Sequence, residues 1–444
     1  MIPPDEARPL LLALGLAFAA PTFQRFTALT AAALLAAGRR TVADLLRTLG
    51  GLAPGRRASR QRLLPTAQWP GPQPARLLTR FLLQRLSPQG AVRLAGGGAA
   101  DGRKGKKAHG EARRRGPVRP ARSYTAGRYG HKRVALAVLA SFPFAARPRA
   151  LPVLVGLYYR EEDDRRRGRP RRAPARRLRR LLRLMPLRFP QRKFLVIGDS
   201  AYGAHEVARF ACRRRGRLTP VGKPRPQADS FEPPPPHPGE GRPRVKGRPL
   251  PKPSRAARAA RRRRPTAGRY GGGRRRVGVV TGRGRWYKSG RGPAPLRRVF
   301  VHDKSGGRRD GYFFSTDPAP DPRAVAGHYT ARRGVETTFR ELRARPGPEA
   351  ARGRRRNTAR RAAPRPFGLY SVVALLHASL PASRRELPVR RPGKEAVTPS
   401  DALTAARRRP WLEGVFPQAD GGCAAEKLPG PTRAIILSAL APAA

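Results

Sequence analysis

The sequence is poor in cysteine and in acidic residues. Cys212 and Cys423 are the only cysteines in 444 residues, which disfavours both a disulfide framework and a structural zinc site. Only 27 Asp and Glu residues oppose 96 Lys and Arg, so the net charge is +69. This charge disfavours an ordinary metabolic enzyme, because self-repulsion opposes a compact fold unless a polyanion neutralises it. Nucleic acid is therefore the favoured partner.

Long apolar runs are also missing. The two most apolar stretches, residues 9–21 and 29–37, are each too short to span a bilayer. Asp5 and Glu6 precede them where a secretory signal would carry basic residues. We therefore expect two packed helices, no membrane partner and a cytoplasmic, nucleoid-associated protein.

Helical periodicity is present in the first 90 residues. Residues 42–49 carry an apolar stripe behind Thr41, an expected N-cap, and a basic stretch at 56–62 follows a glycine turn. This outline is typical of a DNA-binding helix-turn-helix. A plain helical hairpin in an arginine-rich chain fits it equally, so both interpretations stay open.

The middle of the chain predicts an α/β core, because apolar strands and a helix alternate there. The expected strands are 134–140, 151–159 and 194–200, and the expected helix is 177–187. Residues 213–275 read as linker, with proline, arginine and glycine patches. Strands return at 276–281, 299–302 and 312–315, and helices are expected at 322–345 and 367–380.

Two places carry candidate chemistry. Tyr329, Arg332, Glu336 and Arg343 share one face of the late helix, within an arc of roughly 60°. This face is either a solvated surface with an Arg–Glu pair or a metal-binding carboxylate flanked by phosphate-holding groups. Asp199 ends an apolar strand, where α/β folds place ligands, although an Asp-Ser pair can also cap the next helix.

These residues resemble a known signature. Tyr329, Arg332, Glu336 and Arg343, in the spacing Tyr-x2-Arg-x3-Glu-x6-Arg, are similar to the signature of IS4-type DDE transposases, in which the last position is usually Lys. Gly198-Asp-Ser-Ala-Tyr-Gly203 resembles the segment that carries the second catalytic aspartate of that family. Other matching stretches are 123–126, 130–132, 142–144, 151–152 and 312–317.

The resemblance implies an α/β, ribonuclease-H-like core that is interrupted by a mostly β insertion and preceded by a helical domain. The expected divisions are an N-terminal helical region, two parts of the core separated by the insertion, and a Pro/Arg-rich tail. Their boundaries are 1–90, 91–203, 204–310, 311–384 and 385–444.

The resemblance also implies metal-dependent cutting and joining of DNA strands. Three carboxylates, with Asp199 and Glu336 among them, would hold two Mg²⁺ ions, or Mn²⁺ in their place. Tyr329, Arg332 and Arg343 would hold phosphates. The implied partners are transposon terminal inverted repeats and target DNA, bound by a homodimer.

Two further residues are expected to contact DNA. Lys132 belongs to one of the matching stretches. Trp286 is a candidate for stacking on an unpaired base, and packing within a small β-sheet is its alternative role.

The first carboxylate is where the sequence departs from the family pattern. Ungapped counting places the motif Gly-Asp-Asp-Thr on residues 96–99, so the catalytic position is Gly98, which has no side chain to bind a metal. Asp101, three residues further on, is the one nearby substitute. We therefore expect a transposase whose activity is impaired, and the alternative is a non-catalytic, Arg-rich DNA-binding relic.

Overall fold

The structure is a computed structural model. It describes residues 5–410, together with 429, 432, 436, 439 and 440. Within 5–410 the description omits 37–39, 51–55, 70, 101–107, 116–126, 171–172, 215, 238, 271–272, 345–353, 382–384, 386–391, 393 and 395. Asp101 and the stretch 123–126 therefore lie outside the described residues.

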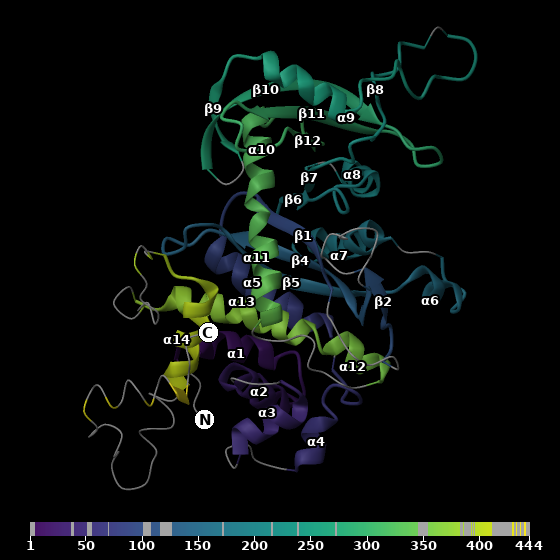
Figure 1. Ribbon diagram of the computed structural model, residues 1–444. Helices are drawn as coiled ribbons and strands as arrows, with labels where there is room; N and C mark the ends of the chain where they lie inside the picture. The colour runs from purple at the N-terminus through teal and green to yellow at the C-terminus, as the bar shows by residue number, and fades with distance from the viewer. Residues whose placement is uncertain are drawn as a thin grey trace.

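A sheet with the strand order β5-β4-β1-β6-β7 forms the core (Figure 1). β1 (Val92–Ala100) pairs antiparallel with β4 (Lys132–Ala140), and β4 pairs antiparallel with β5 (Arg149–Tyr158). β6 (Phe194–Gly198) runs parallel to β1, and β7 (Leu218–Gly222) runs parallel to β6. This is the ribonuclease-H-like α/β arrangement, and the predicted strands at 134–140, 151–159 and 194–200 are all confirmed.

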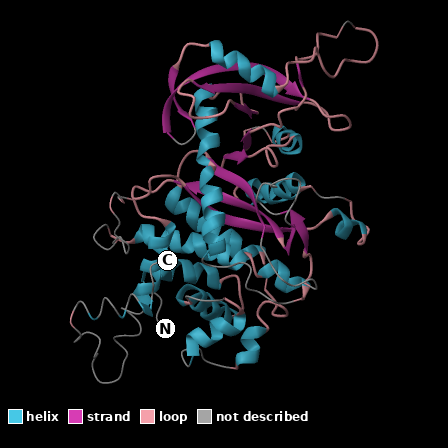
Figure 2. Ribbon diagram, in the orientation of Figure 1, coloured by secondary structure: helices cyan, strands magenta, loops and turns pink. Residues whose placement is uncertain are grey.

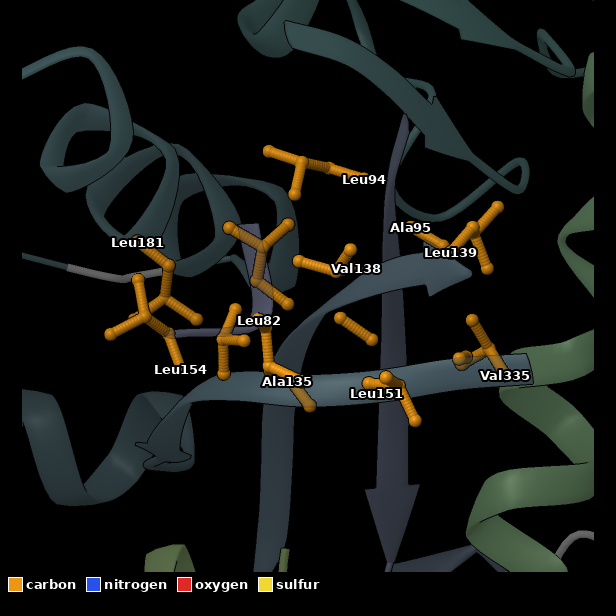
Figure 3. Close-up of a cluster of buried hydrophobic side chains, with 14 of the residues drawn as sticks. Leu82, Leu94, Ala95, Ala135, Val138, Leu139, Leu151, Leu154, Leu181 and Val335 are labelled. Carbon is orange, nitrogen blue, oxygen red and sulfur yellow. The ribbon is translucent and has the colours of Figure 1, made fainter. Parts of the chain in front are cut away.

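The sheet is covered on both faces. Neighbouring residues of β1 show this, because a side chain at Gly96 would meet Leu178 of α7 (Pro174–Arg188), whereas one at Gly97 would meet Val335 of α11 (Arg333–Ala344). β4 lies between these layers, and every residue of its apolar run 134–140 is buried. Figure 3 shows side chains from the sheet, α7 and α11 converging in this core.

Other helices complete the layers. α8 (His205–Cys212) packs on α7 and β7, while α13 (Pro364–Ser379) lies against β5 and α5 (Pro72–Leu86) contacts both β5 and α13. The predicted helices at 177–187 and 367–380 are thus confirmed as α7 and α13.

The core sheet continues without interruption into the insertion. β12 (Gly311–Ser315) pairs with β7 on one side and with β11 (Ala294–Asp303) on the other. The sheet then runs on through β10 (Gly273–Trp286) to β8 and β9. Figure 2 shows the helix formed by α10 (Pro322–Ala331) and α11 running between this upper part of the sheet and the core. The remaining elements here are β8 (Ser230–Phe231), α9 (Pro253–Ala256), a 3₁₀ helix (Ala257–Arg262) and β9 (Thr266–Tyr270).

The expected start of the insertion at residue 204 is wrong, because α8 and β7 belong to the core. The interpretation of 213–275 as mostly linker missed β7, α9 and β9, which lie within it. These elements are short and stand between proline and arginine, so no apolar periodicity marks them. The strands expected at 276–281, 299–302 and 312–315 are confirmed as parts of β10, β11 and β12.

The N-terminal region is helical, as expected. Thr41 caps α3, because its hydroxyl accepts a hydrogen bond from the backbone N–H of Asp44 at 3.2 Å. Buried leucines of α3 pack with α2 and with residues of α13 and α14 in a second apolar cluster. The elements here are a 3₁₀ turn (Asp5–Ala7), α1 (Arg8–Gly15), α2 (Ala20–Leu35), α3 (Val42–Leu49) and α4 (Arg57–Gln61).

The remaining elements are β2 (Ala112–Arg115), β3 (Gly127–Gly130), α6 (Glu161–Arg165), α12 (Arg356–Arg361) and α14 (Pro399–Pro410). β2 and β3 pair in a separate two-stranded sheet, and α14 packs on α13 and α2. None of the described helices is both long and apolar enough to cross a membrane.

Candidate active site

Asp199 follows the last residue of β6 and is fixed by its own turn. Its Oδ1 accepts hydrogen bonds from the backbone N–H groups of Ala201, at 2.9 Å, and Tyr202, at 3.2 Å. The next helix, α8, begins only at His205 and has Ala204 as its N-cap. The helix-capping alternative for Asp199 is therefore wrong, and its second carboxylate oxygen is left to face the α10–α11 helix.

Arg332 connects the two candidate carboxylates. Its Nη2 lies 3.3 Å from Oδ2 of Asp199 and 2.8 Å from Oε1 of Glu336. The Arg332 side chain is 10% exposed, whereas that of Asp199 is 30% and that of Glu336 66% exposed. One shielded guanidinium thus holds two more exposed carboxylates, and the solvated-face interpretation of this helix is wrong for Arg332.

The predicted helix 322–345 is divided at Arg332 into α10 and α11. Gly334 shows how tightly this part of the helix is held, since a Cβ there would lie 2.6 Å from the backbone oxygen of Pro148. This close approach brings the first turn of α11 against the chain that leads into β5. It involves residues far apart in the sequence, so local periodicity gives no sign of the break.

Tyr329 lies on α10, close to the ion pairs. Its ring packs on Phe313 at a centroid separation of 4.8 Å. Burial raises the pKa of the Tyr329 phenol, and the nearby Arg332 opposes this shift. The group therefore stays protonated at neutral pH and offers a neutral hydroxyl beside the carboxylates.

Arg343 is exposed and lies two turns of α11 beyond Glu336, roughly 10 Å along the axis, so it is not part of the ion-paired cluster.

The two glycines at the first-carboxylate position face opposite ways. Residues paired across parallel strands share a face of the sheet, and Ala95 is paired with Ile197. Continuing this register by two residues puts Gly97 level with Asp199. A Cβ at Gly97 points to α11, 2.6 Å from Cγ1 of Val335.

A Cβ at Gly98 points instead at the hydroxyl of Tyr202, on the other side of the strand. Tyr202 is buried, and burial together with Asp199 raises the pKa of its phenol. Gly98, the position chosen from the sequence, therefore faces Tyr202 and not α11, the helix that carries Glu336. The strand position that faces that helix is Gly97.

Two other predicted contacts have different surroundings. Trp286 is buried with Ala294, Leu296 and Phe314, and its ring meets Phe314 edge-on at 5.4 Å. It packs the insertion against α8, so its ring is not presented to a DNA base. Lys132 is paired with Ala100 at the end of β1, which places it at the same end of the sheet as the glycines.

The structure also has a groove beside Glu336 that was not predicted from the sequence. It has a volume of about 540 Å³ and lies between the β11–β12 turn, β7 and α10–α11. Its basic residues are Lys223, Arg308, Arg309, Arg332 and Arg333, and its aromatic residues are Tyr270, Phe313 and Tyr329. The sequence Gly307-Arg-Arg-Asp-Gly311, a basic turn between two strands, was the available signal.

The described residues, which do not include Asp101, do not fit a two-metal cage. Within the described parts of the chain, no three His, Cys, Asp or Glu side chains gather closely enough to hold a metal ion. Asp199 and Glu336 are the pair available, and both already contact Arg332. The implied third carboxylate has no counterpart at Gly97, where Val335 and Phe339 fill the space, or at Gly98, which is exposed and faces the Tyr202 hydroxyl.

The fold and this site define a ribonuclease-H-like protein with carboxylates from β6 and α11. The sequence matches the family model described as DDE superfamily endonuclease over residues 14–276, which is more than half of the 444 residues, and the chain belongs to that family. The match includes Asp199 and ends before α11, so Glu336 lies outside it.

No curated protein matches the sequence. Among solved structures, the chain is similar to the piggyBac transposase in its synaptic complex with hairpin DNA, at 12% sequence identity and a TM-score of 0.42. The similarity covers 98% of this chain and 82% of that chain.

Proposed function

We propose that this protein is an insertion-sequence transposase of the IS4 type that retains DNA binding and is impaired in cutting and joining strands. The observation that carries this proposal is the pairing of Asp199 and Glu336 through Arg332 beside a strand of glycines. In the proposed site, Asp199 and Glu336 supply two of the three carboxylates that the family resemblance implies, and β1, which would supply the first, carries glycine at 97 and 98.

DNA binding rests on distributed charge. The net charge is +69, and the groove beside Glu336 is lined by Lys223, Arg308 and Arg309. Such contacts to phosphate are many and individually weak, so the loss of one carboxylate leaves them intact. We propose transposon terminal inverted repeats and target DNA as the partners, bound by a homodimer, with Lys132 and Arg343 as further contacts.

The proposed family chemistry is phosphoryl transfer, for which Mg²⁺ or Mn²⁺ would activate the nucleophile and stabilise the leaving oxygen. The loss of one of three carboxylates removes part of the cage for such ions. We therefore expect the rate of strand cleavage to be lower by orders of magnitude than that of a complete site.

A binding measurement tests the first half of the proposal. We expect the chain to bind an end-containing duplex in a gel-shift titration, with the dissociation constant rising steeply as NaCl is increased. Arg308→Glu should weaken binding by about tenfold at 0.1 M salt. Arg183→Glu makes the same charge change on α7, across the sheet, and serves as the control. Equal weakening by both variants would contradict the assignment of the groove.

A cleavage measurement tests the second half. We expect the chain to bind the same duplex without nicking it in Mg²⁺ or Mn²⁺, and Asp199→Asn should leave binding within about twofold. Nicking by the chain that is abolished in Asp199→Asn would show an active transposase. Gly98→Asp points at Tyr202, so we expect this single change to restore nothing. If Gly97→Asp also fails while all variants bind DNA, the DNA-binding relic is the better description.

A further inference from the structure

We infer that Arg332 is the resident cation of this site, so that a divalent metal ion can bind between Asp199 and Glu336 only by displacing the guanidinium. This inference concerns the protein without DNA and goes beyond the proposed function. It assigns Arg332 a role toward the protein's own carboxylates, in addition to the phosphate contact that the family resemblance implies.

Distance carries the first step. The same nitrogen of Arg332, Nη2, is within 3.3 Å of Asp199 and 2.8 Å of Glu336. A metal that binds both carboxylates would need the space where this nitrogen lies. The cation and its two anions sum to one negative charge, whereas three free carboxylates would present three. The site with Arg332 in place therefore attracts a divalent ion less strongly than a site of three free carboxylates would.

Burial carries the second step. Arg332 is 8% exposed, and it lies close enough to the Tyr329 phenol to lower its pKa. A shielded guanidinium that leaves its partners must either find others or remain as an unpaired charge, and this is costly. Glu336, at 66% side-chain exposure, is the partner that could turn away to solvent. Asp199 is held by the turn that its other oxygen makes, and so the Arg332–Asp199 contact is the more constrained of the two.

The third argument concerns β1, which has glycine where the family resemblance implies a carboxylate. In the metal site that the family resemblance implies, a further carboxylate would come from β1. At Gly97 the space for a side chain is taken by Val335 and Phe339, whose atoms lie 2.6 Å and 2.8 Å from an ideal Cβ. Gly98 is exposed, and its nearest side-chain neighbour is the Tyr202 hydroxyl. The packing at Gly97 thus suits glycine, and the arginine supplies the positive charge that the carboxylates require.

The test is a titration of Mn²⁺ with protein, in which the electron paramagnetic resonance signal of free Mn²⁺ decreases as the ion binds. We expect Arg332→Gln to bind Mn²⁺ at least about tenfold more tightly than the unaltered chain. Adding Asp199→Asn to that variant should abolish the gain. Arg323→Gln is the matched control, because it removes the same charge from α10, where Arg323 pairs with Asp321.

Two outcomes would overturn the inference. The first is an Arg332→Gln variant that folds, as judged by circular dichroism, yet binds Mn²⁺ no better than the unaltered chain. The second needs no folded variant at Arg332: tight Mn²⁺ binding by the unaltered chain that is lost in Asp199→Asn. Because no DNA is present, neither outcome depends on the DNA-binding and cleavage measurements of the proposed function.

Discussion

His377 of α13 is a buried ionisable group that the candidate site does not use. Its ring lies 5.0 Å from that of Phe144, and within the described structure neither ring nitrogen has a hydrogen-bond partner. Burial, together with the charges of Arg149 and Arg385, lowers the pKa of His377 from 6.5 to about 4, against the opposing effect of Asp401. The histidine is therefore neutral in the folded protein at neutral pH.

This residue predicts how stability changes with pH. The unfolded chain binds a proton at His377 near pH 6.5 and the folded chain only near 4, so its contribution is complete above 6.5 and falls as the pH drops toward 4. The loss is up to about 3 kcal/mol in the free energy of unfolding. Denaturant titrations at several pH values should show a shallower dependence for His377→Leu, and the exposed His237→Leu should keep the original one. An unchanged dependence in His377→Leu would contradict the prediction.

The contact between β1 and α11 sets what the first strand can carry. Gly97 has Val335 and Phe339 of α11 directly over it, and Figure 3 shows Val335 beside the sheet residues that it packs on. We predict that Gly97→Ala lowers the free energy of unfolding by about 1–3 kcal/mol, because the added methyl forces the helix or the strand to shift. Gly282→Ala in β10 is the control, since nothing lies within 4 Å of its Cβ position. A difference of less than about 0.5 kcal/mol between the two variants in chemical denaturation would contradict this packing.

What the sequence allowed to be predicted depends on the range of the interactions involved. β4 and β6 were predictable because they are uninterrupted apolar runs, and the Thr41 cap because its partner is three residues away. The direction in which a side chain at position 98 would point was not predictable. It depends on the register of β1 against β6, which lies about a hundred residues later in the chain.

The site shows the same limit. Asp199 and Glu336 could be chosen as a pair from the family signature. The position of Arg332 between them depends on the break between α10 and α11 and on the packing against Pro148. Short β7 and β9 were hidden among prolines and arginines, and the insertion was therefore expected to begin too early.

For the molecule as a whole, charge is the dominant physical feature. A net charge of +69 repels itself in the folded state more than in the expanded unfolded chain. We predict that the melting temperature rises by several degrees between 0.05 and 0.5 M NaCl, because salt screens this repulsion. Differential scanning calorimetry of the protein without nucleic acid would check it. A melting temperature that falls with salt would mean that the ion pairs, rather than the repulsion, dominate.

The pairing of β7 with β12 also has a mechanical consequence. Since the core and the insertion share one hydrogen-bonded sheet, the far strands β9 and β10 are joined to Asp199 through paired strands and not only through loops. The strands between this outer edge and Asp199 set the distance between them. A polymer that bound along the outer edge would therefore lie at one spacing from the carboxylates. Changing that spacing would require adding or removing a strand, whereas changing a loop would leave it as it is.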